Sequence, residues 1–269
     1  MDLELRTHVA AVVGSAQGIG RAIAAAFAAE GAAVVLIDRM EAVHATADEL
    51  AAAHGVRTLA LQGDVTDYGR MKACAAEAKA AMGRVDHVVF AVAIGSGKFG
   101  FPFWDLSPGD WPRVLEVNVV GGANVAHAFA PLLVEARSGT MTFLASIAGQ
   151  IGSQTDPPYS ASKAAIINFA QCAAKDLAPY GVRVNTLCPG MVKTALNQSV
   201  WESWAKKQTP ETWQGYEDWA GDKVRRVVPL GRWQTPEDIA AMAVFLASAR
   251  AANVTGQTVN VDGGFVMHW

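Results

Sequence analysis

The stretch Gly14-Ser15-Ala16-Gln17-Gly18-Ile19-Gly20 decides the fold of this chain. It follows a strand-like apolar run at 8–13 and opens an Ala-rich helical pattern over 18–30. Glycines allow a tight turn and the close approach of a pyrophosphate, and a helix N-terminus offers unpaired N–H groups. Many strand-to-helix turns are rich in glycine for steric reasons alone. The motif by itself therefore supports a dinucleotide site and a purely structural turn about equally.

Outward from this motif, the alternation of strand and helix repeats along the chain. Strand-like runs are predicted at 8–13, 33–37, 58–61, 87–91, 140–145 and 182–187, and helical patterns at 18–30, 41–54, 67–82, 111–137 and 159–178. Strands that are apolar throughout and alternate with helices indicate a parallel sheet covered on both faces. We predict an α/β fold, a doubly wound Rossmann-like sheet in three αβα layers, as a single domain over residues 1–269.

Composition excludes several classes of function. The 269 residues are 51% hydrophobic and carry a formal charge of −3, which is too mild and mixed for a nucleic-acid or membrane-surface protein. Cys74, Cys172 and Cys188 have no metal-ligand spacing, so we expect buried thiols in a reducing compartment and no metal site. The start is acidic and no apolar run reaches about 18 residues. We expect a cytoplasmic protein without nucleic-acid or membrane partners.

Acidic residues at two predicted strand ends fit the adenosine part of a dinucleotide. Asp38 lies where a carboxylate accepts hydrogen bonds from both ribose hydroxyls. Its charge repels a 2′-phosphate and favours NAD over NADP; Arg39 opposes this by attracting that phosphate, and Gln17 replaces an expected basic partner. Asp64-Val65 follows the third strand, where the carboxylate suits the adenine amino group and the backbone suits the ring. The alternatives are helix caps, Asp38 for the helix at 41–54 and Asp64 for the helix at 67–82.

A second group of polar residues suits proton transfer. Tyr159 and Lys163 place a phenol and an ammonium one turn apart on one helix face. A neighbouring cation lowers the pKa of tyrosine from about 10 toward neutrality, where a phenol can pass a proton. Ser146 ends the preceding strand and can bind a substrate oxygen, or merely cap a helix. Asn118 interrupts an apolar helical region, where it supports a helix break and a water chain to Lys163, or is a satisfied core amide.

Taken together, these residues resemble the short-chain dehydrogenase/reductase family in its compact, single-domain branch. The resemblance covers residues 6–265. The matching motifs are Gly14-x-x-x-Gly18-Ile19-Gly20, Asp38, Asp64-Val65, Asn118-Val119, Ser146, Tyr159-x-x-x-Lys163, Asn185, Pro189-Gly190 and Val261-Asp262-Gly263-Gly264.

The resemblance implies an NAD(H)-dependent oxidoreductase that interconverts a secondary alcohol and its ketone by hydride transfer. It implies Tyr159 as general acid or base, and Lys163 as partner of the nicotinamide ribose and of the phenol. It implies Ser146 as ligand of the substrate oxygen and Asn118 as support of a proton-relay water. Further cofactor contacts are implied at the strand ends, at Ala91, Pro189, Gly190, Val192 and Thr194. Relatives of this size are usually tetramers, so we expect a homotetramer.

Two positions depart from the family pattern. Val13 replaces the Thr that commonly precedes the first glycine, and Phe90-Ala91-Val92-Ala93 replaces the usual Asn-Asn-Ala-Gly. We expect these departures to reduce the rigidity of the sheet and the affinity for the cofactor. The second departure is the one feature that favours an alternative function, a non-catalytic NAD(H)-binding sensor, against which the intact proton-relay residues argue. A third function, isomerisation or dehydration by transient oxidation, is disfavoured because such relatives usually have a larger C-terminal domain.

The segment 191–226 resembles the mobile substrate lid of the family. Its aromatic residues form either the buried stripe of lid helices or a stacking wall for a flat apolar substrate: Trp201, Trp204, Trp213, Tyr216 and Trp219. A facing wall is expected from Phe99, Phe101, Phe103 and Trp104.

Charges near the expected substrate site are few, while hydroxyl-binding side chains precede the tyrosine: Gln150, Gln154 and Asp156. This favours a cyclic, aromatic or polyol-like secondary alcohol over a phosphorylated or acyl-carrier substrate. Basic residues of the 191–226 segment are expected on the solvated surface, unless the segment folds inward around an anionic group: Lys206, Lys207, Arg225 and Arg226.

Overall fold

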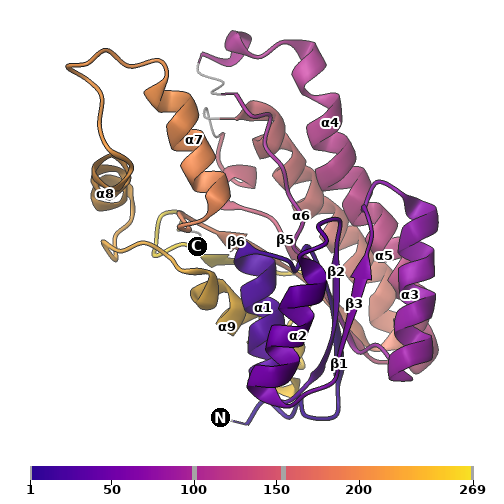
Figure 1. The fold of residues 1–269 in the computed structure, drawn as a ribbon. Helices are drawn as coiled ribbons and strands as arrows, with labels where there is room; N and C mark the ends of the chain where they lie inside the picture. The colour runs from indigo at the N-terminus through magenta and orange to yellow at the C-terminus, as the bar shows by residue number, and fades with distance from the viewer. Residues whose placement is uncertain (1, 99–101, 153–155, 268–269) are drawn as a thin grey trace.

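The predicted parallel sheet is present in a computed structural model, which describes residues 2–98, 102–152 and 156–267 (Figure 1). The described strands form one parallel sheet in the order β3-β2-β1-β4-β5-β6-β7. Their bounds are β1 Val9–Val13, β2 Ala33–Asp38, β3 Thr58–Gln62, β4 His87–Phe90, β5 Gly139–Leu144, β6 Val182–Pro189 and β7 Thr258–Val261. The strand order reverses between β1 and β4, and sheets of this kind bind ligands at the carboxyl ends beside that point.

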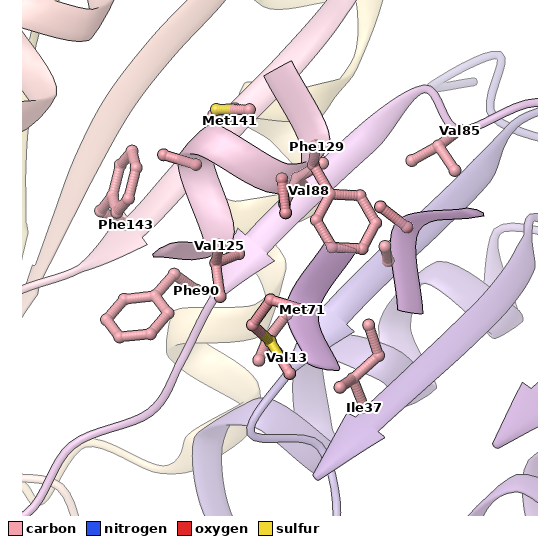
Figure 2. Packing of buried hydrophobic residues seen from close by; sticks show 14 of the residues in the cluster. Val13, Ile37, Met71, Val85, Val88, Phe90, Val125, Phe129, Met141 and Phe143 are labelled. Atoms are coloured by element: carbon pink, nitrogen blue, oxygen red, sulfur yellow. The ribbon is translucent and has the colours of Figure 1, made fainter. Parts of the chain in front are cut away.

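Helices cover both faces of the sheet and bury its apolar side chains. On one face lie α1 (Gly18–Ala29), α2 (Val43–His54) and α9 (Pro236–Ala247), and on the other α3 (Tyr68–Met82), α5 (Gly121–Ala136) and α6 (Pro157–Leu177) (Figure 1). Figure 2 shows one of the two large cores, in which side chains of α3 and α5 meet those of the central strands. The three-layer fold predicted from the sequence is confirmed.

Helix caps settle two of the alternatives left open by the sequence. The N-cap of α3 is Asp67, whose side chain accepts a hydrogen bond from the Arg70 amide, so Asp64 does not cap this helix. The N-cap of α2 is Ala42, so Asp38 does not cap that helix either. Both candidate carboxylates are therefore held by other contacts, which are described with the site.

The helix predicted at 111–137 is interrupted. It consists of α4 (Pro112–Leu115), a π-helical turn over Glu116–Val120, and α5. A π turn contains an extra residue and often marks a functional site. This turn contains Asn118, which is fully buried, so the helix break predicted at this residue is present.

One helical stretch, Pro108–Ala136, is long and apolar enough to cross a membrane by length and composition alone. Half of its most apolar window is buried inside the protein. Val125, Phe129 and Leu133 of α5 belong to the core beneath the sheet, which accounts for the apolar composition (Figure 2).

The cysteine prediction is correct for two residues and wrong for the third. Cys74 and Cys188 are buried free thiols, whereas Cys172 is exposed. Cys172 lies on α6 between the buried residues Ala170 and Ala174, which face the core. Residues two apart on a helix point in different directions, so Cys172 faces outward.

Candidate active site

The predicted site residues meet at one cavity of about 700 Å³ at the carboxyl ends of the strands. Its lining includes nearly all of the residues predicted to bind a cofactor and three of the four predicted to be catalytic. Two predicted residues are absent from the described lining. Ser15 is fully buried and its hydroxyl donates to the Ile37 carbonyl, and Asn118 lies behind the wall.

The glycine motif fits a dinucleotide phosphate by its shape. A Cβ at Gly20 would lie 1.9 Å from the Gly14 carbonyl oxygen, so α1 packs against its own loop only because this position has no side chain. Gly18 has a φ of +58° and open space where a Cβ would be. The loop therefore presents its backbone to the cavity at the N-terminus of α1, an arrangement that suits a pyrophosphate.

Asp38 connects the glycine loop to the end of β2. Its carboxylate accepts hydrogen bonds from the amides of Ala16 (3.0 Å) and Met40 (3.0 Å). A carboxylate has about four lone-pair sites, so two remain for ribose hydroxyls. Arg39 and Gln17 also line the cavity.

Asp64 and Val65 line the same end of the cavity. The Asp64 carboxylate accepts hydrogen bonds from the Thr66 amide and hydroxyl, at 2.9 and 2.8 Å, and these contacts hold its pKa below the usual value despite partial burial. The Val65 carbonyl accepts a hydrogen bond from Asn124 of α5 at 2.9 Å. The carboxylate is thus charged and fixed at the place predicted for an adenine amino group.

Asn118 makes up for the side chains that are missing from the Phe90-Ala91-Val92-Ala93 segment. Its amide accepts from the Ile94 N–H at 2.8 Å and donates to the Ile94 carbonyl and the Ser162 hydroxyl, both at 2.9 Å. The Ala91 amide also donates to the Val13 carbonyl at 2.8 Å. Asn118 is thus a satisfied amide at a helix break that ties the loop after β4 to α6, so this loop is held without the usual asparagines.

Tyr159, Ser146 and Lys163 meet at the cavity wall. The Ser146 side chain acts on the Tyr159 phenol by lowering its pKa, and its hydroxyl accepts a hydrogen bond from the Ala148 amide at 3.1 Å. Lys163 is fully buried one helical turn along α6, where its ammonium lies 5.5 Å from the Tyr159 ring centroid and donates to the Leu144 carbonyl at 2.7 Å. A hydroxyl, a phenol and an ammonium thus converge on one part of the cavity. Ser146 also caps a short helical turn, so both of its predicted roles coexist.

The predicted lowering of the Tyr159 pKa is wrong for this state of the protein. Burial raises the pKa of Tyr159 to about 12, with the Ser146 hydrogen bond opposing the shift. Burial also lowers the pKa of Lys163 to about 8. The loss of hydration around both groups outweighs the attraction on which the sequence argument relied, and it keeps the phenol protonated at neutral pH.

The predicted nicotinamide side of the cavity comes from β6 and the residues after it. Pro189, Gly190, Val192 and Thr194 all line the cavity. A Cβ at Gly190 would lie 2.7 Å from the Asp262 Cβ, so the close packing of this turn needs glycine. The Thr194 hydroxyl caps α7 (Ala195–Ala205) by accepting from the Asn197 amide.

A stacking wall of aromatic residues, one of the two arrangements compatible with the sequence, is not present among the described residues of the cavity lining. The rings of α7, of α8 (Tyr216–Val227) and of the segment between them pack on one another instead, in the pairs Trp201–Trp213, Trp201–Tyr216, Trp204–Trp219 and Tyr216–Trp219. These two helices have no sheet beneath them to cover their apolar faces (Figure 1). The structure therefore favours the other arrangement, in which the aromatic residues pack within the 191–226 segment, although Trp213 is exposed.

The aromatic wall expected to face this segment across the cavity is not formed by Phe103 and Trp104, the two of its four residues that the structure describes. Phe103 and Trp104 are each 70% exposed and lie outside the cavity lining, and they pack on each other. Phe99, Phe101 and Gln154 lie outside the described residues. Asp156 does line the cavity, but its carboxylate already accepts from the amides of Ser96 and Tyr159.

Sequence reasoning missed a cation on the substrate side. Lys206, Arg225 and Arg226 are exposed, and Lys207 forms an ion pair with Asp105. Lys223 of α8, which the sequence argument did not consider, lines the cavity. The helical spacing of the segment gives no sign of this, because the direction of a side chain depends on how α8 is oriented over the sheet.

No group of three or more His, Cys, Asp or Glu side chains among the described residues is placed to hold a metal ion.

The fold and the cavity define a dinucleotide-binding oxidoreductase, and comparison with known proteins supplies its family. A family model described as enoyl-(acyl carrier protein) reductase matches residues 13–266. This chain belongs to the short-chain dehydrogenase/reductase family, as its motifs predict.

Several relatives match over nearly their whole length. Galactitol 2-dehydrogenase of Agrobacterium fabrum is 36% identical, with 97% of this chain and 98% of the relative covered. An NAD-dependent glycerol dehydrogenase of Listeria innocua is 30% identical, with 99% and 96% covered. Among solved structures, L-sorbose reductase of Gluconobacter frateurii, in complex with NADPH and L-sorbose, has a TM-score of 0.90 at 27% identity, with both chains fully covered.

Proposed function

We propose that this enzyme interconverts a polyol-like secondary alcohol and its ketone. The residues that we assign to this reaction are Asn118, Ser146, Tyr159 and Lys163. The observation that carries the proposal is that Ser146, Tyr159 and Lys163 meet at the wall of one cavity, with the Lys163 ammonium 5.5 Å from the Tyr159 ring centroid. The relatives named above act on galactitol, glycerol and L-sorbose, which are small polyhydroxy compounds.

The geometry supports a division of roles within this set. The Tyr159 phenol donates a proton to the carbonyl oxygen during reduction, and its phenolate accepts the proton of the hydroxyl during oxidation. Ser146 orients that oxygen, and the buried ammonium of Lys163 stabilises negative charge on the phenol oxygen. Asn118 positions the loop after β4 and α6 through Ile94 and Ser162. A bound nicotinamide dinucleotide supplies the hydride chemistry.

The glycine motif, the strand ends and Lys163 are the residues that would hold this dinucleotide. Gly14, Gly18 and Gly20 frame the pyrophosphate position, Asp38 the adenosine ribose, and Asp64 the adenine. We infer that NAD is preferred over NADP, because the Asp38 carboxylate repels a 2′-phosphate. Its two hydrogen bonds to loop amides hold the charge at this place.

Replacing Asp38 tests this preference. We expect Asp38→Ala to weaken NAD binding about tenfold or more and to bring the Kd of NADP close to that of NAD, because hydrogen bonds to a charged group contribute about 1.5–3 kcal/mol. Fluorescence titration with NADH and NADPH measures both constants. Asp48→Ala, on α2 and with an exposed side chain, is the control. An unchanged ratio of the two constants would show that Asp38 acts only in holding the loop.

A substrate panel tests the reaction itself. The purified enzyme is incubated with NAD or NADP and a series of cyclic, aromatic and polyol secondary alcohols, and the absorbance of the reduced nicotinamide is followed. We expect turnover with polyols and with NAD as the better cofactor. Tight NADH binding without turnover of any alcohol of the panel would favour the alternative, a non-catalytic sensor.

The proposal extends to assembly and location. We propose a cytoplasmic homotetramer, on the basis of the family resemblance and of three free cysteines, a state typical of a reducing compartment. The 191–226 segment would then serve as the substrate lid. Light scattering of the purified protein measures the number of subunits.

A further inference from the structure

Lys223 lies in an unusual electrostatic position on the substrate side of the cavity. It is carried by α8 and lines the cavity together with Thr194, Asn197 and Val200 from the start of the 191–226 segment. Its ammonium lies 5.1 Å from the ring centroid of Trp219, and the residue is partly buried. The Trp219 ring thus lies beside the cation of a residue that lines the cavity.

No carboxylate of the described residues forms an ion pair or hydrogen bond with this ammonium. Three other basic residues of the 191–226 segment differ, since Lys193 pairs with Glu217, Lys207 with Asp105, and Arg225 with Asp222. Burial, with a smaller contribution from the positive charge of Arg226, holds the pKa of Lys223 below the usual value. Removing a charged group from water without an opposite charge is unfavourable. A ligand anion would relieve this cost.

The acidic residues that line the cavity are committed elsewhere. Asp38 and Asp64 lie at the predicted adenosine end and are bound to loop amides or to Thr66. Asp156 accepts from the amides of Ser96 and Tyr159. The other cation at the catalytic end, Lys163, donates to the Leu144 carbonyl. Arg39 and Arg113 also line the cavity, but their charges act on Asp64 at the predicted adenosine end. Lys223 is therefore the cavity cation that is best placed for a charge on the substrate.

We propose that Lys223 is a specificity-determining residue that binds a carboxylate of the substrate; this inference rests on the proposed function. The preferred substrates are then polyhydroxy carboxylic acids and their keto forms, rather than neutral polyols. A carboxylate is favoured over a phosphate because a phosphate dianion is usually bound by arginine, several donors or a helix N-terminus. A single ammonium beside an indole ring matches one negative charge.

Matched substrate pairs test the proposal. D-Gluconate and D-glucitol differ only in whether C1 is a carboxylate or a hydroxymethyl group, and D-threonate and D-threitol form a shorter pair. We expect the wild-type enzyme to prefer the carboxylate of at least one pair by about tenfold or more in kcat/KM, the range for a hydrogen bond to a charged group. Equal turnover of acid and polyol in every pair would overturn the role of Lys223 and leave the oxidoreductase function intact.

Variants separate substrate binding from cofactor binding. We expect Lys223→Met to raise KM for the carboxylate at least about tenfold, while kcat, the KM of the polyol and the Kd of NADH change less than about threefold. Lys223→Arg, which keeps the charge, should retain most of the preference. Lys206→Met is the control, because Lys206 is an exposed lysine of the same segment that does not line the cavity. A weaker NADH affinity with an unchanged preference would place Lys223 at the cofactor and overturn the proposal.

Calorimetry covers the case in which no member of the panel is turned over. D-Gluconate and D-threonate are then each titrated into the enzyme in the presence of saturating NADH. Saturable binding that Lys223→Met abolishes and Lys206→Met preserves would support the carboxylate site, although the proposed reaction on these compounds would have failed. Absence of binding by both carboxylates would overturn the carboxylate site.

Discussion

Tyr159→Phe lowers kcat at least about a thousandfold and leaves the Kd of NADH within about twofold of the wild-type value. This is the expected result because the substitution removes the transferable proton and keeps the ring, and general acid–base catalysis contributes about 10²–10⁴-fold. Burial raises the pKa of Tyr159 to about 12, so the phenol is protonated at neutral pH and ready to donate to a ketone. Steady-state kinetics in both directions and fluorescence titration with NADH measure the two quantities.

The control for this prediction is Tyr180→Phe. Tyr180 lies in a short helical turn after α6, is 37% exposed and does not line the cavity. Its loss of a hydroxyl should change neither quantity. If Tyr159→Phe kept turnover near the wild-type rate, the assigned proton transfer would be wrong, whatever the effect of the control.

Gly20→Ala weakens NADH binding at least about tenfold and lowers the melting temperature. The added Cβ would lie 1.9 Å from the Gly14 carbonyl oxygen and 3.2 Å from the Ala91 Cβ, so the glycine loop must move away from α1. Overpacking of this kind costs about 1–3 kcal/mol, which corresponds to roughly 2–10 °C for a chain of this size. Thermal unfolding with and without NADH measures both effects.

A glycine outside the cavity serves as the matched control. A Cβ at Gly109 would find its nearest atom, the Ser107 hydroxyl oxygen, at 3.6 Å, and this position does not need a left-handed backbone. Gly109→Ala should therefore leave both the melting temperature and NADH binding unchanged. Equal behaviour of the two variants would contradict the role of Gly20 in shaping the phosphate loop.

Much of the fold follows from local patterns in the sequence. Apolar strands followed by Ala-rich helices and glycines predicted six of the seven described strands and the helices that cover the sheet except α9, because these patterns depend on neighbouring residues only. The same holds for the glycine motif and the Tyr159–Lys163 spacing, whose geometry a single turn or helix fixes. Interruption of the helix at Asn118 was also predictable, since a lone amide in an apolar region needs partners.

The tertiary structure decided which long-range contacts these residues make. It paired Asn118 with Ile94 and Ser162, and Asp156 with Ser96, contacts across 24, 44 and 60 residues of chain that no local pattern encodes. It also reversed the expected pKa shift of Tyr159, because burial depends on the whole surrounding fold.

The substrate side depended most on the tertiary structure. The spacing of its aromatic residues was equally compatible with a wall facing the substrate and with a packed stripe, because helical periodicity defines a face and leaves open what that face contacts. The orientation of α7 and α8 packed the rings together and brought Lys223 to the cavity. The sequence by itself therefore determined the sheet, the phosphate loop and the reacting groups. Only the packing of distant segments decided which charge the substrate meets, because burial and side-chain direction are properties of the folded chain.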